Sequence, residues 1–86
     1  MNNPLLTTLE IIETLSRGHS TLAALGEQFG ISPPTVRRCI AEGRLIGADI
    51  VSRKVGTTWR FTLVNWDDCK RLCLRWIELE KTRRIV

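Results

Sequence analysis

The segment that most constrains the fold is residues 30–34, Gly-Ile-Ser-Pro-Pro. Two consecutive prolines cannot lie inside an α-helix, because each lacks the N–H that the interior needs and its ring clashes with the preceding turn. They are tolerated in a first turn, where that N–H has no partner in any case. The segment therefore predicts that one helix ends at Gly30 and that another begins at Pro33, with Ser32 as its N-cap.

Apolar residues at helical spacing lie on both sides of this corner. Upstream, Ser20 or Thr21 can cap a short helix, and downstream the third helix runs from Pro33. The side chains that we expect to point inward are Leu22, Leu25, Phe29, Val36, Cys39 and Ile40. Gly43 weakens a helix, so the third helix either stops at Glu42 or continues to Ile46.

The remaining elements have equally clear boundaries. Asn3 and Pro4 suit the start of a first helix, whose stripe continues through Leu9, Ile12 and Leu15 up to a stop near Gly18. From residue 48 two runs rich in β-branched and aromatic residues flank a turn at residues 56–58, which predicts a hairpin. The last segment predicts a helix with Asn65 as its cap and Asp67 and Asp68 in the first turn.

Length and charge limit the function. Eighty-six residues make one small domain, with little material for the walls of a catalytic pocket. Residues 1–36 carry one basic and three acidic residues, whereas residues 37–60 carry six basic and two acidic ones. A positive charge concentrated in one part of a chain is typical of a surface that faces phosphate. Three cysteines without disulfide spacing, no signal peptide and no membrane-length apolar run lead us to expect a cytoplasmic, nucleoid-associated protein.

The corner and its surroundings resemble a known DNA-binding family. Gly26, Gly30 and Val36 match the small residue, glycine and β-branched residue of the helix-turn-helix signature. Residues 5–64 resemble the winged helix-turn-helix N-terminal domain of the biotin repressor and its relatives, and "IAEGRLIGADIVSR" also resembles excisionase-type and MerR-like winged helices. The expected fold is mainly α with a small β-hairpin: residues 1–64 as the winged helix-turn-helix domain and residues 65–86 as a C-terminal helix.

The resemblance implies which residues would meet double-stranded DNA. The recognition helix would span residues 33–42 and the wing residues 53–60. An arginine fork matches guanine in the major groove, so we expect Arg37 or Arg38 to read bases. The candidate recognition-helix residues are Ser32, Pro33, Pro34, Thr35, Arg37, Arg38 and Glu42. The candidate wing residues are Arg53, Lys54, Thr57, Thr58 and Arg60, and the candidate phosphate contacts are Ser20, Thr21 and Arg44.

The C-terminal helix is more apolar than a helix lying on one small domain requires, which favours homodimerisation. The candidate dimerisation residues are Trp66, Cys69, Leu72, Cys73, Trp76 and Ile77. Cys69 and Cys73 could also suggest a metal site, but His19 is the only histidine, so we expect packing rather than metal binding. Acidic pairs such as Asp67 and Asp68 fit a helix cap better than catalysis, and we expect no enzyme, cofactor or small-molecule effector.

Three functions remain open at this point. The first is a sequence-specific DNA-binding regulator, a repressor acting as a homodimer on a palindromic site. The second is an architectural factor of recombination, replication or packaging, which would bind several direct repeats. The third is a protein-interaction module whose basic face inhibits a nucleic-acid enzyme, since a fold alone does not determine function.

Overall fold

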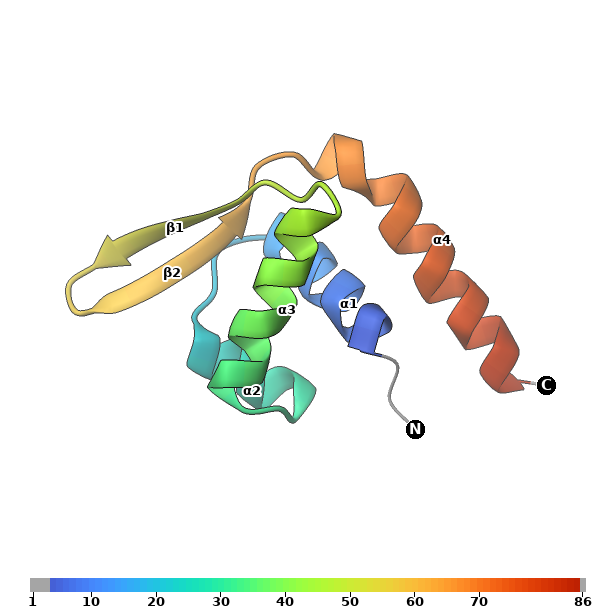
Figure 1. Ribbon diagram of the computed structural model, residues 1–86, viewed down its shortest axis with the longest axis horizontal. Coiled ribbons are helices and arrows are strands. Elements are labelled where there is room, and N and C mark those ends of the chain that lie inside the picture. The colour runs from blue at the N-terminus through green and yellow to red at the C-terminus, as the bar shows by residue number, and fades with distance from the viewer. Residues whose placement is uncertain (1–3, 86) are drawn as a thin grey trace.

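The computed structural model describes residues 4–85, with side chains for residues 6–79. Residues 4–85 fold into four helices and one two-stranded antiparallel sheet (Figure 1). In order these are α1 (Pro4–Ser16), α2 (Leu22–Phe29), α3 (Pro33–Leu45), β1 (Ile50–Val55), β2 (Thr58–Leu63) and α4 (Trp66–Ile85). The mainly helical fold with a small hairpin confirms the class expected from the sequence. The predicted cap at Asn3 lies outside the described residues.

Helix α1 lies at the centre of the core. Its side chains Leu9, Ile12 and Leu15 are each at most 1% exposed, and the helix contacts α3, α4 and β2. Helix α2 packs mainly against α3 through the buried Leu25. The positions buried on α1 recur at the three- and four-residue spacing that the sequence shows, so the hydrophobic stripe indicated the core correctly.

Gly43 marks a close approach of three elements and does not end α3. The helix continues past it to Leu45. A Cβ atom at position 43 would lie 3.2 Å from Ile12 Cδ1 and 3.4 Å from Ile50 Cδ1. Glycine is therefore explained here by packing of α3 against α1 and β1, which local sequence could not distinguish from a helix end.

Asn65 stands directly before α4, but its side chain does not cap that helix. Its Oδ1 accepts a hydrogen bond from the Asp49 N–H at 2.7 Å, and its Nδ2 donates to the Gly47 carbonyl at 2.9 Å. Asn65 thus satisfies backbone groups of the α3–β1 loop, where Gly47 has a φ of 108°. The expectation of a side-chain cap at Asn65 was wrong, because a loop distant in sequence needs the same polar atoms. Asp67 and Asp68 do lie in the first turn of α4.

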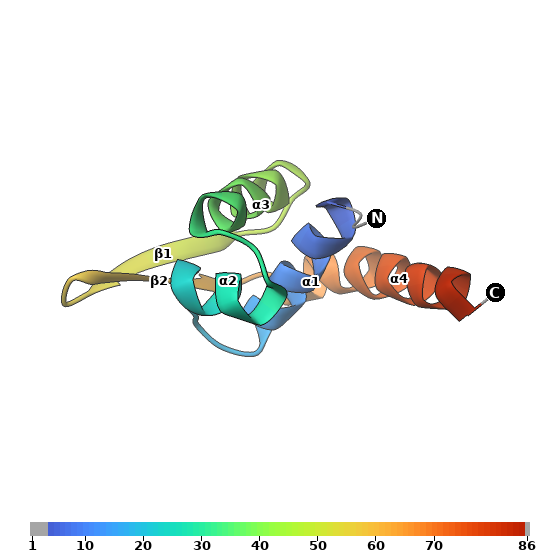
Figure 2. The same ribbon diagram turned by 90° about the horizontal axis from the view of Figure 1, so that it is seen from below.

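The hairpin projects away from the helices in both ribbon views (Figures 1 and 2). Its register pairs Ile50 with Leu63 at the base and Val55 with Thr58 at the tip, and Gly56 occupies the turn with a φ of 65°. Ile50 and Leu63 are buried, whereas Val55 is exposed. The hairpin is therefore anchored at its base and free at its tip.

Candidate nucleic-acid interface

The corner between α2 and α3 is held by backbone contacts that only a glycine allows. Gly30 ends α2 in the left-handed conformation, with a φ of 68°, and its N–H bonds to the Gly26 carbonyl. The Ile31 N–H bonds to the same carbonyl at 2.9 Å. A Cβ atom on Gly26 would lie only 2.6 Å from the Ile31 carbonyl oxygen. These contacts fix the direction in which α3 leaves the corner.

The start of α3 agrees with the sequence prediction. Ser32 is the N-cap, and its Oγ accepts a hydrogen bond from the Thr35 N–H at 3.4 Å. The Ser32 and Thr35 hydroxyls also lie 2.8 Å apart. Pro33 and Pro34 occupy the first turn and are exposed. Pro33 and Pro34 carry no N–H, and the Thr35 and Val36 N–H groups already donate to Ser32, so the first turn of α3 leaves only the exposed Ser32 and its hydroxyl for a phosphate, not free backbone donors.

The side of α3 that faces solvent carries the arginines. Val36, Cys39 and Ile40 are buried, whereas Arg37, Arg38 and Ala41 are exposed, and Leu45 at the end of this face is 85% exposed. Figure 2 shows α3 as the outermost element on its side of the molecule. Ala41 and Leu45 were not among the sequence candidates. The helical spacing from Pro34 to Ala41 and Leu45 would have identified them.

Arg37 and Arg38 have no acidic partner among the described side chains. The ion pairs present there join Glu13 of α1 to Arg17, which directly follows that helix, and Asp67 to Lys70 on α4. The guanidinium groups of Arg37 and Arg38 therefore keep their donors available to a ligand, unlike Arg17 and Lys70, which are already paired.

Two other candidates on α3 make contacts within the protein. Glu42 Oε2 accepts a hydrogen bond from the buried Thr8 Oγ1 at 3.0 Å. The Arg44 guanidinium donates twice to the Ile50 carbonyl, from Nε at 3.0 Å and from Nη2 at 2.7 Å. Glu42 thus links α3 to α1, and Arg44 links α3 to the start of β1. Both contacts position α3, and neither was predicted from the sequence.

The candidates between α1 and α2 also have structural partners. Ser20 forms an antiparallel bridge with Phe61, with hydrogen bonds of 2.9 and 2.8 Å between their backbones. Thr21 caps α2, since its Oγ1 accepts from the Ala24 N–H at 3.1 Å. The bridge ties the α1–α2 connection to the outer side of β2 and so fixes the hairpin relative to the helices.

The hairpin residues that were predicted to contact DNA lie on both faces of the two-stranded sheet. Because side chains alternate along a strand, the register places Arg53, Thr58 and Arg60 on one face and Lys54 on the other, beside Trp59. Thr57 lies in the turn at the exposed tip. The five wing candidates therefore cannot all contact one flat surface.

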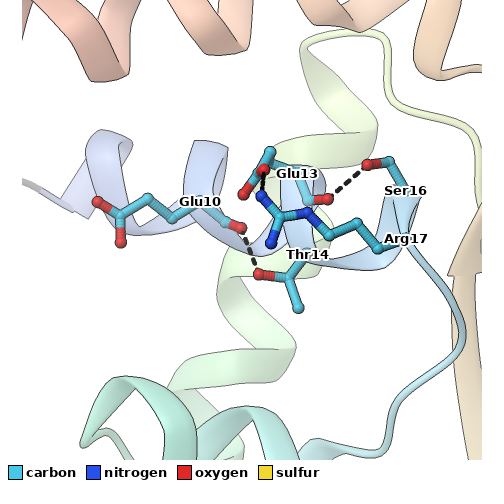
Figure 3. A network of polar contacts seen from close by, with 5 residues as sticks. All are labelled: Glu10, Glu13, Thr14, Ser16 and Arg17. Atoms are coloured by element: carbon cyan, nitrogen blue, oxygen red, sulfur yellow. Dashed lines mark hydrogen bonds and ion pairs between the residues drawn. The ribbon is translucent and has the colours of Figure 1, made fainter.

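Whereas the exposed face of α3 carries arginines, the face of α1 away from α3 carries carboxylates. A groove of about 380 Å³ there is lined by Glu10, Glu13, Arg17 and Phe29, among others. Figure 3 shows Arg17 lying across Glu13, to which it is paired, and the Thr14 hydroxyl donating to the Glu10 carbonyl at 2.9 Å. The unpaired cations of α3 and the carboxylates of α1 are thus separated onto different sides of the domain.

The dimerisation candidates on α4 split into an inner and an outer set. Cys69 and Cys73 are buried, and Trp66 and Ile77 are half-buried against the core. Burial raises the pKa of the Cys73 thiol to about 11, with smaller contributions from Cys69 and Glu13, and burial also raises the pKa of Cys69. Leu72 and Trp76 remain exposed. The two cysteines pack within the chain, and the outer pair is accessible to a partner.

Among the described residues, no group of three or more histidine, cysteine, aspartate or glutamate side chains could hold a metal ion. Within residues 4–85, none of the helices combines the length and the apolarity that a transmembrane segment requires.

We compared the chain with family models, with curated proteins and with solved structures, and none of these comparisons gave a match. What the protein does must therefore be inferred from its own residues.

Proposed function

We propose that this protein binds double-stranded DNA sequence-specifically and acts as a small transcriptional regulator of the repressor type, with α3 as its reading element. One observation carries the proposal. Arg37 and Arg38 are adjacent, exposed and without an acidic partner in the described chain, on the outermost face of a helix whose direction is fixed by the Gly26–Ile31 corner.

The dimensions and chemistry of this face suit a major groove. A helix with its side chains is about 10–12 Å wide, and the major groove is about 12 Å wide. An arginine can donate two parallel hydrogen bonds to O6 and N7 of guanine, which distinguishes this base from the others. The small Ala41, one turn beyond Arg37 and Arg38, lets the helix backbone approach the bases.

The order of the elements supports the winged helix-turn-helix interpretation. Helix α1 is followed by the Ser20 bridge to β2, then by α2, the corner, α3 and the hairpin. In this interpretation the hairpin is the wing, and the exposed Thr57 at its tip would meet the sugar–phosphate backbone beside the groove.

The test replaces both arginines while controlling for lost charge. Fluorescence anisotropy would compare Arg37→Gln/Arg38→Gln with Lys70→Gln/Arg71→Gln, which removes the same two charges from adjacent positions of α4. Each lost bidentate base contact costs about 1–3 kcal/mol, so we expect the α3 variant to lose at least about tenfold in affinity for a selected site. The α4 variant should retain its preference for that site over a scrambled duplex. Equal losses of specificity in the two variants would contradict a reading role for α3.

We also propose that two copies pair through α4. Leu72, Trp76 and Leu79 are exposed and follow one another at intervals of four and three residues, which makes an apolar stripe beside the inner face of the helix. The first turn of α4 holds Asp67 and Asp68, whereas its last residues include Lys81, Arg83 and Arg84 in the sequence. An antiparallel pair would set the acidic start of each helix against the basic end of the other.

Sedimentation equilibrium tests this pairing with a matched control. Leu72→Glu lies on the stripe, whereas Leu74→Glu changes another exposed leucine, which lines the groove beside α1 and α2. We expect Leu72→Glu to be monomeric at concentrations where the unmodified protein and Leu74→Glu are dimers. If the unmodified protein is monomeric, the dimer proposal is wrong, whereas the proposed reading role of α3 is unaffected.

A further inference from the structure

The hairpin face directed away from α3 places two arginines directly opposite each other. Arg53 and Arg60 are register partners, so their side chains leave the same face of the sheet. Ile50 belongs to the other face and packs beside Gly43 of α3, which puts α3 on that other side. The arginine pair is therefore separate from the surface formed by α3.

This arrangement has an electrostatic cost that nothing in the described chain offsets. Like charges directly opposite each other on antiparallel strands destabilise a sheet. Neither Arg53 nor Arg60 forms an ion pair with a carboxylate of residues 6–79. On the opposite face the corresponding neighbours are Lys54 and Trp59, which do not repel each other.

A third nitrogen donor joins the pair from outside the hairpin. His19 Nδ1 lies 3.1 Å from Arg60 Nη1. Because a guanidinium can only donate, Nδ1 accepts, and the neutral ring then carries its proton on Nε2 as a further donor. The neighbouring Ser20 is bridged to Phe61, so the histidine is held beside the strand.

These groups line one cavity. It has a volume of about 250 Å³, and its walls are His19, Arg53, Arg60, Val51, Val55 and Thr62. Its two valines are 40% and 53% exposed, so the site is open and an anion can reach the guanidinium groups from solvent. We propose that this cavity binds a phosphate group, either the phosphodiester of a nucleic-acid backbone or the phosphate of a small phosphate ester. This site does not depend on base reading by α3.

Thermal unfolding tests the site with inorganic phosphate as the probe. Tm would be measured with increasing sodium phosphate against sodium chloride at the same ionic strength, because a ligand of the folded state stabilises it in a saturable manner. The variants are Arg53→Gln, Arg60→Gln and Arg60→Lys, and Lys54→Gln on the other face is the control. We expect Arg53→Gln and Arg60→Gln to need at least about tenfold more phosphate for the same rise in Tm, with Arg60→Lys less affected and Lys54→Gln unchanged.

The same rise in Tm for Arg53→Gln, Arg60→Gln and Lys54→Gln would overturn the proposal, because phosphate would then act through general exclusion from the surface. Two competitors in an Arg37→Gln/Arg38→Gln background identify the source of the phosphate. Displacement of phosphate by a random-sequence duplex supports a backbone contact, and displacement by a nucleoside monophosphate but not by the duplex supports a small ester. If Arg53→Gln or Arg60→Gln loses the phosphate response but still binds its specific DNA site, the phosphate site and the reading role of α3 are independent.

Discussion

Gly26→Ala and Gly43→Ala form a pair of substitutions that isolates the corner on which α3 depends. Both glycines lie within helices, so alanine should add about 1 kcal/mol of helix propensity at each. At Gly26 the new Cβ would lie 2.6 Å from a backbone oxygen, and real Cβ contacts essentially never fall below 3.0 Å. The α2–α3 corner must therefore open by at least 0.4 Å. At Gly43 the nearest atom, at 3.2 Å, is the end of the Ile12 side chain, which can shift.

Overpacking against rigid atoms costs about 1–3 kcal/mol, so Gly26→Ala should be less stable than Gly43→Ala by about that amount. For a domain of this size, 1 kcal/mol corresponds to about 4–8 °C in Tm. Urea unfolding followed by tryptophan fluorescence gives both free energies of unfolding, and the comparison is valid only if the two m-values agree. Gly18→Ala is the reference for an open site, since nothing lies within 4 Å of its Cβ. If Gly26→Ala is as stable as Gly43→Ala, the corner is not constrained as described.

Three further predictions concern contacts that link distant parts of the chain. Arg44→Met should lose about 1.5–3 kcal/mol of stability in urea unfolding, because its two charged hydrogen bonds to the Ile50 carbonyl disappear. Glu42→Ala should lose about 0.5–1.5 kcal/mol in the same assay, since the hydrogen bond from the Thr8 hydroxyl that links α1 to α3 would be removed; an unchanged midpoint would show that this bond does not contribute to stability. Stability should fall between pH 9 and pH 11, because the Cys73 thiol ionises at about 9.0 when unfolded but at about 11 when folded, so the unfolded state binds fewer protons there. Cys73→Ala should flatten the dependence of the free energy of unfolding on pH in this range. If the slope persists, other groups cause the loss of stability.

The elements that depend on neighbouring residues were predictable. Residues 30–34 specified both the end of α2 and the start of α3, because a left-handed glycine and first-turn prolines act locally. The hairpin followed from its β-branched runs and the glycine at its turn. The exposure of Arg37 and Arg38 followed from their spacing relative to Val36 and Ile40.

The contacts that the sequence did not predict join residues far apart in the chain. Asn65 looked like a local cap, yet it satisfies the loop at Gly47 and Asp49. Arg60 meets His19, a residue that the periodicity placed in no element. Helical and strand periods specify which side of an element is buried, but not which polar groups of other elements reach that side. Long-range polar partners therefore needed the fold.

The most direct test of the central claim is selection of bound sequences from random double-stranded DNA. For the unmodified protein we expect enrichment of a guanine-containing motif, repeated as an inverted pair if α4 forms the dimer and as direct repeats if the protein is architectural. The enrichment should disappear for Arg37→Gln/Arg38→Gln and persist for Lys70→Gln/Arg71→Gln. No enrichment, together with no retention of any duplex at low salt, would contradict DNA binding and would favour an acidic protein partner for the basic face.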